Sequence, residues 1–138
     1  MTVENYLAEA GALGTLAGVL AGFAISAVIQ LLSTNSESKV TTATILAFAA
    51  STVMLLYSLI VFVLTFAATA EQNRIISELD TLGSVAVLVM LGAVYVFLAA
   101  IGLAGWIRSR TTGIVTTSFA VFTACITSVA VASILSVF

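Results

Sequence analysis

The chain has 138 residues, of which 62% are hydrophobic, with four basic and six acidic side chains, no histidine and no proline. A water-soluble domain of this composition would lack the polar residues needed to cover its surface. The composition therefore excludes a soluble fold, a disulfide scaffold, a disordered chain and a nucleic-acid binder. The net charge of -2 is spread over so few sites that it indicates neither an acidic nor a basic partner.

The charges divide the chain into four uncharged windows, at residues 10–36, 40–70, 81–107 and 111–138. Each window is longer than the roughly 20 apolar residues that carry a helix across a bilayer. We therefore expect one all-α membrane domain over residues 1–138, multi-pass in a plasma or inner membrane, with transmembrane helices at about 7–32, 40–70, 82–107 and 113–138. The segment before the first window lacks the basic residues of a signal peptide, so we expect this span to be retained.

Two features mark the ends of the second and third helices. Glu71 and Arg74 are three residues apart and Arg74 and Glu78 four apart, a spacing that brings opposite charges together on a helix. This spacing predicts that the second helix projects beyond the lipid and that the connection to the third helix is itself helical. Trp106, followed by Arg108, predicts an interfacial anchor at the end of the third helix.

The first helix has a patterned surface. At about 100° per residue, its small and polar residues fall within an arc of roughly 120° that also holds Val19, Ile29 and Gln30; they are Gly11, Thr15, Gly18, Gly22, Ser26 and Ser33. Large apolar residues cover most of the remaining surface, and Gly14 lies outside the arc. Close helix packing explains this pattern, because the glycines at 14, 18 and 22 have small-xxx-small spacing. A pore is the second explanation, because copies of the helix around an axis would present a ring of hydroxyls and the Gln30 amide.

Enzyme chemistry is not expected from this sequence. No carboxylate lies inside a span and no nucleophile has a base beside it. A metal site of the His/Cys kind is excluded because Cys125 is the single cysteine and histidine is absent. Proton-coupled export is disfavoured, because no acid that could relay protons occurs between Glu9 and Glu37. We expect no cofactor.

Segments of the first three helices resemble, in order, those of the Orai calcium channel family. Residues 20–30 (LAGFAISAVIQ) are similar to the family's pore helix, in which a Ser-Gly-Phe-Ala core leads to an acidic filter residue. Residues 45–48 (ILAF) and 51–53 (STV) are similar to the second span, and residues 97–108 (FLAAIGLAGWIR) to the end of the third. The helical second-to-third connection predicted above is also a family feature.

The resemblance implies an oligomeric bundle with helix one central and lining the pore. Carried over by position, it places the selectivity filter at Gln30 and other pore positions at Thr15, Val19, Gly22, Phe23 and Ser26. The polar arc adds Ile29 to the pore lining. Gly14 and Gly18 are assigned to helix packing.

The departures from the family concern mainly its charged positions. Gln30 replaces the filter acid, Thr15 the basic inner position, Ala100 the third-helix acid, and Ser26 the valine gate. Because amide dipoles hold a divalent ion less well than carboxylates do, we expect a channel for Na⁺, K⁺ or Ca²⁺ with weak calcium selectivity. The sequence shows neither the basic extension nor the C-terminal helix that receives the family's activator, so we expect no activator protein of that type.

The leading hypothesis is therefore a homo-oligomeric cation channel resembling Orai. The alternatives are a non-conducting membrane scaffold or accessory subunit that packs through the helix-one glycines, and a small transporter or membrane-disrupting effector. Orientation also has two readings. The basic residues Lys39, Arg108 and Arg110 outnumber Arg74 and would place the termini outside. The family resemblance places the termini inside, which we prefer.

Overall fold

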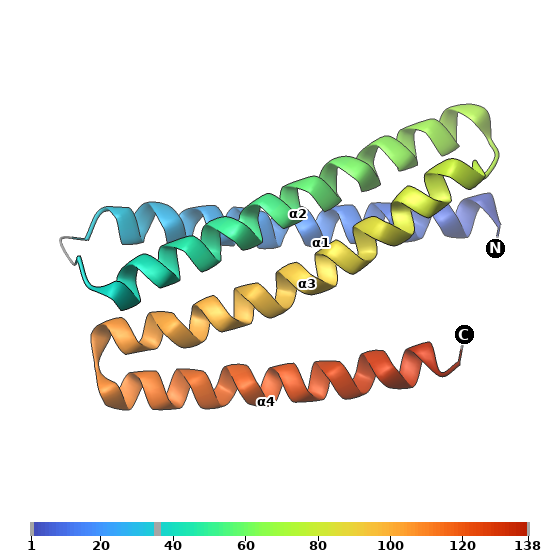
Figure 1. Ribbon diagram of the computed structural model, residues 1–138. Coiled ribbons are helices and arrows are strands. Elements are labelled where there is room, and N and C mark those ends of the chain that lie inside the picture. Colours follow the sequence, from blue (N-terminus) through green and yellow to red (C-terminus); the bar gives the residue numbers. More distant parts are fainter. Residues whose placement is uncertain (1, 35–36, 138) are drawn as a thin grey trace.

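The computed structural model describes residues 2–34 and 37–137, and within them the chain forms four consecutive helices (Figure 1). They are α1 (Val3–Leu32), α2 (Lys39–Gln72), α3 (Ser77–Arg108) and α4 (Arg110–Leu135). Each is long and apolar enough to cross a membrane, which confirms the prediction of four apolar helices of membrane-spanning length. Both chain ends and the α2–α3 connection lie at one end of the bundle, the terminal end, and the α3–α4 connection lies at the opposite end.

α1 and α4 begin earlier than the charge pattern predicted because side-chain caps precede them. α1 begins at Val3 rather than near residue 7, because the Thr2 hydroxyl accepts a hydrogen bond of 3.2 Å from a backbone N–H of the first turn. α4 begins at Arg110 rather than near residue 113, because the Ser109 hydroxyl accepts one of 3.1 Å from the Thr112 backbone N–H. α4 ends at Leu135, before the predicted end at residue 138.

The connection between α2 and α3 is a turn rather than a helix. α2 ends at Gln72 because Asn73 adopts the left-handed conformation, with φ of 49°, which asparagine tolerates better than most residues. The Arg74 guanidinium Nε donates to the Gln72 side-chain oxygen at 3.1 Å. α3 then begins at Ser77 rather than near residue 82. The predicted helical connection is therefore wrong, since one left-handed residue interrupts it.

α2 supplies the seam around which the subunit is packed. Its buried side chains recur at alternating intervals of three and four residues, which keeps them on one side of the helix; they are Thr41, Thr44, Phe48, Ser51, Leu55, Ser58, Phe62, Thr65 and Thr69. α1 contributes Ala17 and Ala21 to the same core, and α3 contributes Ala86 and Ala93. Small residues let helix backbones approach closely in an apolar environment.

Two serines of this seam connect α2 to α3. The Ser51 hydroxyl donates to the Ala93 carbonyl and the Ser58 hydroxyl to the Ala86 carbonyl, each at 3.0 Å. The two pairs are seven residues apart on both helices, so they share one antiparallel register. Both serines are 0% exposed, and a buried hydroxyl without a partner would be destabilising.

α4 packs mainly against α3, most tightly at the opposite end of the bundle. A Cβ added at Gly105 would lie 2.8 Å from the Thr112 carbonyl oxygen, and one added at Gly113 would overlap the Trp106 ring. The Trp106 indole N–H donates to the Thr117 hydroxyl at 2.8 Å. Trp106 is 41% exposed, as expected for an interfacial residue. Its hydrogen bond also connects α3 to α4.

Candidate functional site

The residues predicted to line a pore lie on the face of α1 that the rest of the subunit leaves uncovered. This exposed face carries Thr15, Val19, Gly22, Phe23, Ser26, Ile29 and Gln30. The other side of the helix is buried, and it consists of Ala10, Gly14, Ala17, Ala21 and Ala24. Packing within the subunit therefore uses the row of small residues, and the exposed face mixes small and polar side chains with apolar ones.

The three spaced glycines of α1 have different surroundings. A Cβ added at Gly14 would lie 3.6 Å from the Phe62 Cβ, and one at Gly18 would lie 3.7 Å from a Leu59 methyl group. Both of these glycines therefore contact α2. A Cβ added at Gly22 meets no described atom within 4 Å, so this glycine is open where the other two are covered.

The hydroxyls of the exposed face are bonded back to their own helix. The Thr15 hydroxyl donates to the Gly11 carbonyl and the Ser26 hydroxyl to the Gly22 carbonyl, each at 2.9 Å. Because each proton is used inside the helix, the remaining lone pairs of the oxygens stay available outside it. Gln30, exposed near the end of α1, adds an amide oxygen. The face thus offers neutral oxygen acceptors, which can coordinate a cation weakly.

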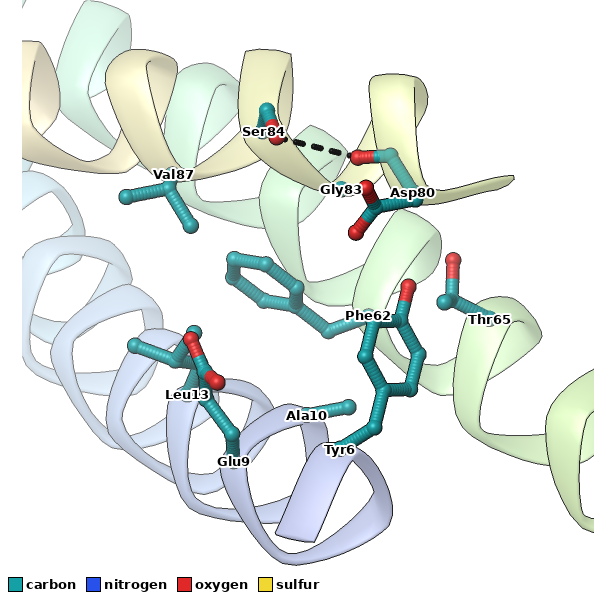
Figure 2. Close-up of a pocket in the computed structure, with 10 residues that line it drawn as sticks. All are labelled: Tyr6, Glu9, Ala10, Leu13, Phe62, Thr65, Asp80, Gly83, Ser84 and Val87. Carbon is teal, nitrogen blue, oxygen red and sulfur yellow. Dashed lines mark hydrogen bonds between the residues drawn. The ribbon is translucent and has the colours of Figure 1, made fainter. Parts of the chain in front are cut away.

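A second polar site, which sequence reasoning did not find, lies at the terminal end between α1, α2 and α3 (Figure 2). It is a partly open cavity of about 100 Å³. Its polar lining comprises Tyr6 and Glu9 of α1, Thr65 of α2, and Asp80 and Ser84 of α3. The Phe62 ring contributes to its apolar wall. The cavity therefore brings together two carboxylates that are far apart in the sequence.

Contacts within the cavity leave the Asp80 carboxylate directed into it. The Ser84 hydroxyl donates to the Asp80 backbone carbonyl at 3.0 Å, not to the carboxylate. The Tyr6 hydroxyl reaches across from α1 to α3, where a Cβ added at Gly83 would lie 3.6 Å from it. Figure 2 shows the Tyr6 hydroxyl and the Asp80 carboxylate pointing into the space between the helices.

Ligand sets of the usual transition-metal kind are not formed by the part of the chain that the structure describes. Within it, no three side chains of His, Cys, Asp or Glu come together. Cys125 is exposed on α4. The polar side chains on the exposed face of α1 are hydroxyls and an amide, and those lining the cavity are hydroxyls and two carboxylates.

Comparison with known proteins found no relative of this chain. No protein-family model, no curated protein and no solved structure matches this chain.

Proposed function

We propose that the protein is a subunit of a homo-oligomeric cation channel, in which copies of α1 surround a shared axis and turn their exposed face towards it. The exposure of the neutral, oxygen-bearing face of α1 carries this proposal. Small and polar side chains gain little from lipid tails, whereas around an axis they would contact one another and water. The four membrane-length helices provide the surroundings that such a pore needs.

In this channel Gln30 forms the selectivity filter, near the α1–α2 end of the helix. Ser26, Gly22, Val19 and Thr15 line the path toward the terminal end. Because this face holds no charged side chain, ions would be coordinated by dipoles alone, which favours weak discrimination between Na⁺, K⁺ and Ca²⁺. The resemblance to the Orai family at residues 20–30 supports the same assignment.

The second candidate function is a non-conducting scaffold or accessory subunit. Gly14 and Gly18 favour it, because both already allow helix packing, in their case against α2. Gly22 and the face around it would then receive a helix of a neighbouring copy without leaving a path for ions. The two functions predict the same assembly and differ only in flux.

The orientation that goes with the channel has the termini inside. The acidic residues gather at that end, which holds Glu4, Glu9, Glu71, Glu78 and Asp80 beside Arg74. In oriented vesicles, a single cysteine replacing Ser109 would then react with an impermeant maleimide from outside. Reaction only after the vesicles are opened would reverse the orientation.

Crosslinking tests whether α1 meets its own copies. In a Cys125→Ser background, single cysteines replacing Ser26 or Gln30 should form disulfides between identical subunits. A cysteine replacing Val129, 67% exposed on α4, is the matched control and should not. Crosslinks at Val129 and none at Ser26 or Gln30 would exclude α1 from the axis and reject both functions.

Flux through reconstituted protein separates the channel from the scaffold. Gln30→Glu should raise the permeability to Ca²⁺ relative to Na⁺ by about tenfold or more, because it adds a ring of carboxylates. Gln72→Glu makes the same chemical change at the terminal end and should leave the ratio unchanged. Absence of flux from the crosslinked, correctly assembled protein would establish the scaffold instead.

A further inference from the structure

We propose that the open groove between α3 and α4 holds an acyl chain of an anionic phospholipid from the surrounding bilayer, with the lipid headgroup bound at Arg110. α3 lines the groove from Tyr95 to Trp106, and α4 lines it from Thr117 to Ala124. No residue of α1 takes part. The inference therefore holds equally for a channel or a scaffold, and for either orientation in the membrane.

The groove offers an apolar surface, because the polar atoms of its lining are already paired. The Tyr95 hydroxyl is hydrogen-bonded to that of Ser128 at 2.7 Å, and the Trp106 indole N–H donates to the Thr117 hydroxyl at 2.8 Å. The rest of the lining is aliphatic or glycine, as at Ala120. A polar ligand would lose its hydrogen bonds to water there without replacement, whereas a hydrocarbon chain has none to lose.

The groove has the length of one leaflet of a bilayer. Tyr95 and Trp106 are eleven residues apart, which is about 16 Å along a helix. The hydrocarbon part of one leaflet is about 15 Å, half of the core of a bilayer. Trp106 stands at the end of the predicted span 82–107, and Tyr95 stands near its middle. A chain in the groove would therefore run from the headgroup level to the bilayer midplane.

The width of the groove suits a hydrocarbon chain and not a helix. A volume of about 490 Å³ over a length of about 16 Å gives a cross-section of about 30 Å². A helix about 10 Å in diameter has a cross-section of about 80 Å². At Gly102 the floor is closed, since an added Cβ would lie 3.6 Å from the Thr117 Cα and 3.7 Å from the Ala120 Cβ. An extended acyl chain can lie on this floor, whereas a neighbouring helix cannot enter.

Arg110 stands at the turn end of the groove, on the groove side of α4. It precedes Thr117 by seven residues and Ala124 by fourteen, a spacing that returns to nearly the same side of a helix. Arg108 follows Trp106 by two residues, which turns it about 200° away from the groove side of α3. Arg110 is exposed, and its guanidinium forms no ion pair or hydrogen bond within the described residues. It is therefore available to a phosphate, which a guanidinium binds well.

The charge around the turn selects an anionic lipid. Residues 81–138 contain no acidic side chain, so Arg108 and Arg110 are the charges of the α3–α4 hairpin beyond Asp80. At the same end of the bundle, Glu37 and Lys39 of the α1–α2 connection offset each other. Basic residues at a membrane surface attract anionic headgroups. A zwitterionic lipid carries no net charge and would gain less from this position.

The test uses Trp106, which is the single tryptophan of the chain and lines the groove. Phospholipids with brominated acyl chains quench tryptophan fluorescence on contact. In phosphatidylcholine bilayers containing the full chain, the relative binding constant from quenching should be about fivefold higher for brominated phosphatidylglycerol than for brominated phosphatidylcholine, the effect of one basic residue at the surface. Equal constants would overturn the proposal. Absence of quenching by both lipids would also overturn it, since protein, such as a second copy, would then cover the groove.

Neutralising each arginine separates a site in the groove from general attraction to the surface. Arg110→Gln should reduce the fivefold preference for phosphatidylglycerol to about one. Arg108→Gln removes the same charge on the side of α3 away from the groove, and it should change the preference by less than twofold. Equal losses in the two variants would show that the turn attracts anionic lipid without a site at Arg110, and would reject the proposal.

Filling the groove tests the position of the acyl chain. Ala99 lines the groove and is exposed, so Ala99→Phe adds a ring there without disturbing the core and should lower the preference below twofold. Ala130→Phe, at an exposed position of α4 outside the lining, is the matched control and should keep it. An unchanged preference in Ala99→Phe would mean that the chain lies elsewhere.

Each variant is first checked for monodisperse elution and unchanged helical content, so that a lost preference is not a lost fold. If Ala99→Phe fails to fold, the comparison of Arg110→Gln with Arg108→Gln decides. The crosslinking and flux results at Ser26 and Gln30 do not depend on these variants, so this proposal and the proposed function fail separately.

Discussion

α1 packs mainly against α2 and α4 mainly against α3 (Figure 1), and the two helices differ in how much of their surface the subunit covers. α1 buries a row of small residues and exposes a face that contains Gly22 and Ser26. Gly113 is the one buried residue of α4 within the described chain. α4 exposes bulky apolar side chains, among them Phe119 and Phe122, at 67% and 64%.

The difference concerns the room that each helix leaves for a neighbouring molecule. Long apolar side chains such as those of α4 mix well with lipid tails. An open apolar groove of about 490 Å³ between α3 and α4 has room for a lipid chain. The exposed face of α1 also carries apolar side chains, among them Phe23 and Ile29 at 63% and 59%, but Gly22 leaves room for another backbone to approach closely. We therefore expect assembly through α1 and a lipid boundary along α4.

The largest expected effect follows from filling the open face of α1. Gly22→Leu should abolish oligomer formation while each subunit still folds, because no described atom lies within 4 Å of an added Cβ. Light scattering coupled to size exclusion measures the assembly. Ala130→Leu, on the exposed side of α4, is the matched control and should assemble normally. An intact oligomer in Gly22→Leu would mean that assembly uses another surface.

The next effect concerns the attachment of α4 to α3. Gly105→Ala should destabilise the subunit by about 1–3 kcal/mol, because the new methyl group would lie against the Thr112 carbonyl oxygen at 2.8 Å. Unfolding by denaturing detergent in mixed micelles measures the loss. Gly102→Ala is one turn away, and its added Cβ would lie an ordinary 3.6 Å from the Thr117 Cα. If both variants unfold alike, the helices do not approach as closely at Gly105 as described.

The indole hydrogen bond at the same hairpin should contribute less. Trp106→Phe should lower the free energy of unfolding by about 1 kcal/mol, because it removes the N–H that donates to Thr117. Thr117→Val should have a similar effect, and the double variant should be no worse than either single one. Strictly additive losses would indicate that the two side chains act independently.

The smallest effect is expected at the middle of the α3–α4 contact. The Tyr95 and Ser128 hydroxyls are hydrogen-bonded at 2.7 Å, and such a bond between membrane helices is worth about 0.6 kcal/mol. Tyr95→Phe should lower the stability by that amount, whereas Tyr57→Phe, at a 41% exposed position on α2, should have no effect. A loss above that found for Gly105→Ala would make this hydrogen bond, and not the glycine contact, the main attachment of α4.

The helix count could be read from charge-free windows, but the helix ends could not. Transfer into lipid depends on the summed apolarity of about 20 residues, which the windows report directly. A helix end depends on the geometry of one or two residues, as at Thr2 and Ser109, whose hydroxyls cap backbone N–H groups. At Asn73 a single left-handed residue ended α2 although the charges beyond it had helical spacing.

The buried hydroxyls of α2 show why its inner face was not recognised. In sequence, Ser51 and Ser58 interrupt an apolar stretch and select no face of the helix. In the structure each is paired with a carbonyl of α3, so these polar residues occupy the most buried positions. Hydropathy cannot reveal such a pairing, because the partner is a backbone atom whose position depends on the packing of Ala86 and Ala93.

The sequence alone determined that the chain has four apolar helices long enough to cross a membrane, and that α1 carries a row of small and polar residues. These properties follow from local composition, since partition into lipid and helical periodicity act within one segment. Only the tertiary structure decided that Ala17 and Ala21 face inward while Ser26 and Gln30 face outward. It also brought Glu9 and Asp80 to one cavity. Helix pairing depends on shape complementarity and hydrogen bonds between different segments, so the composition of one segment does not predict it.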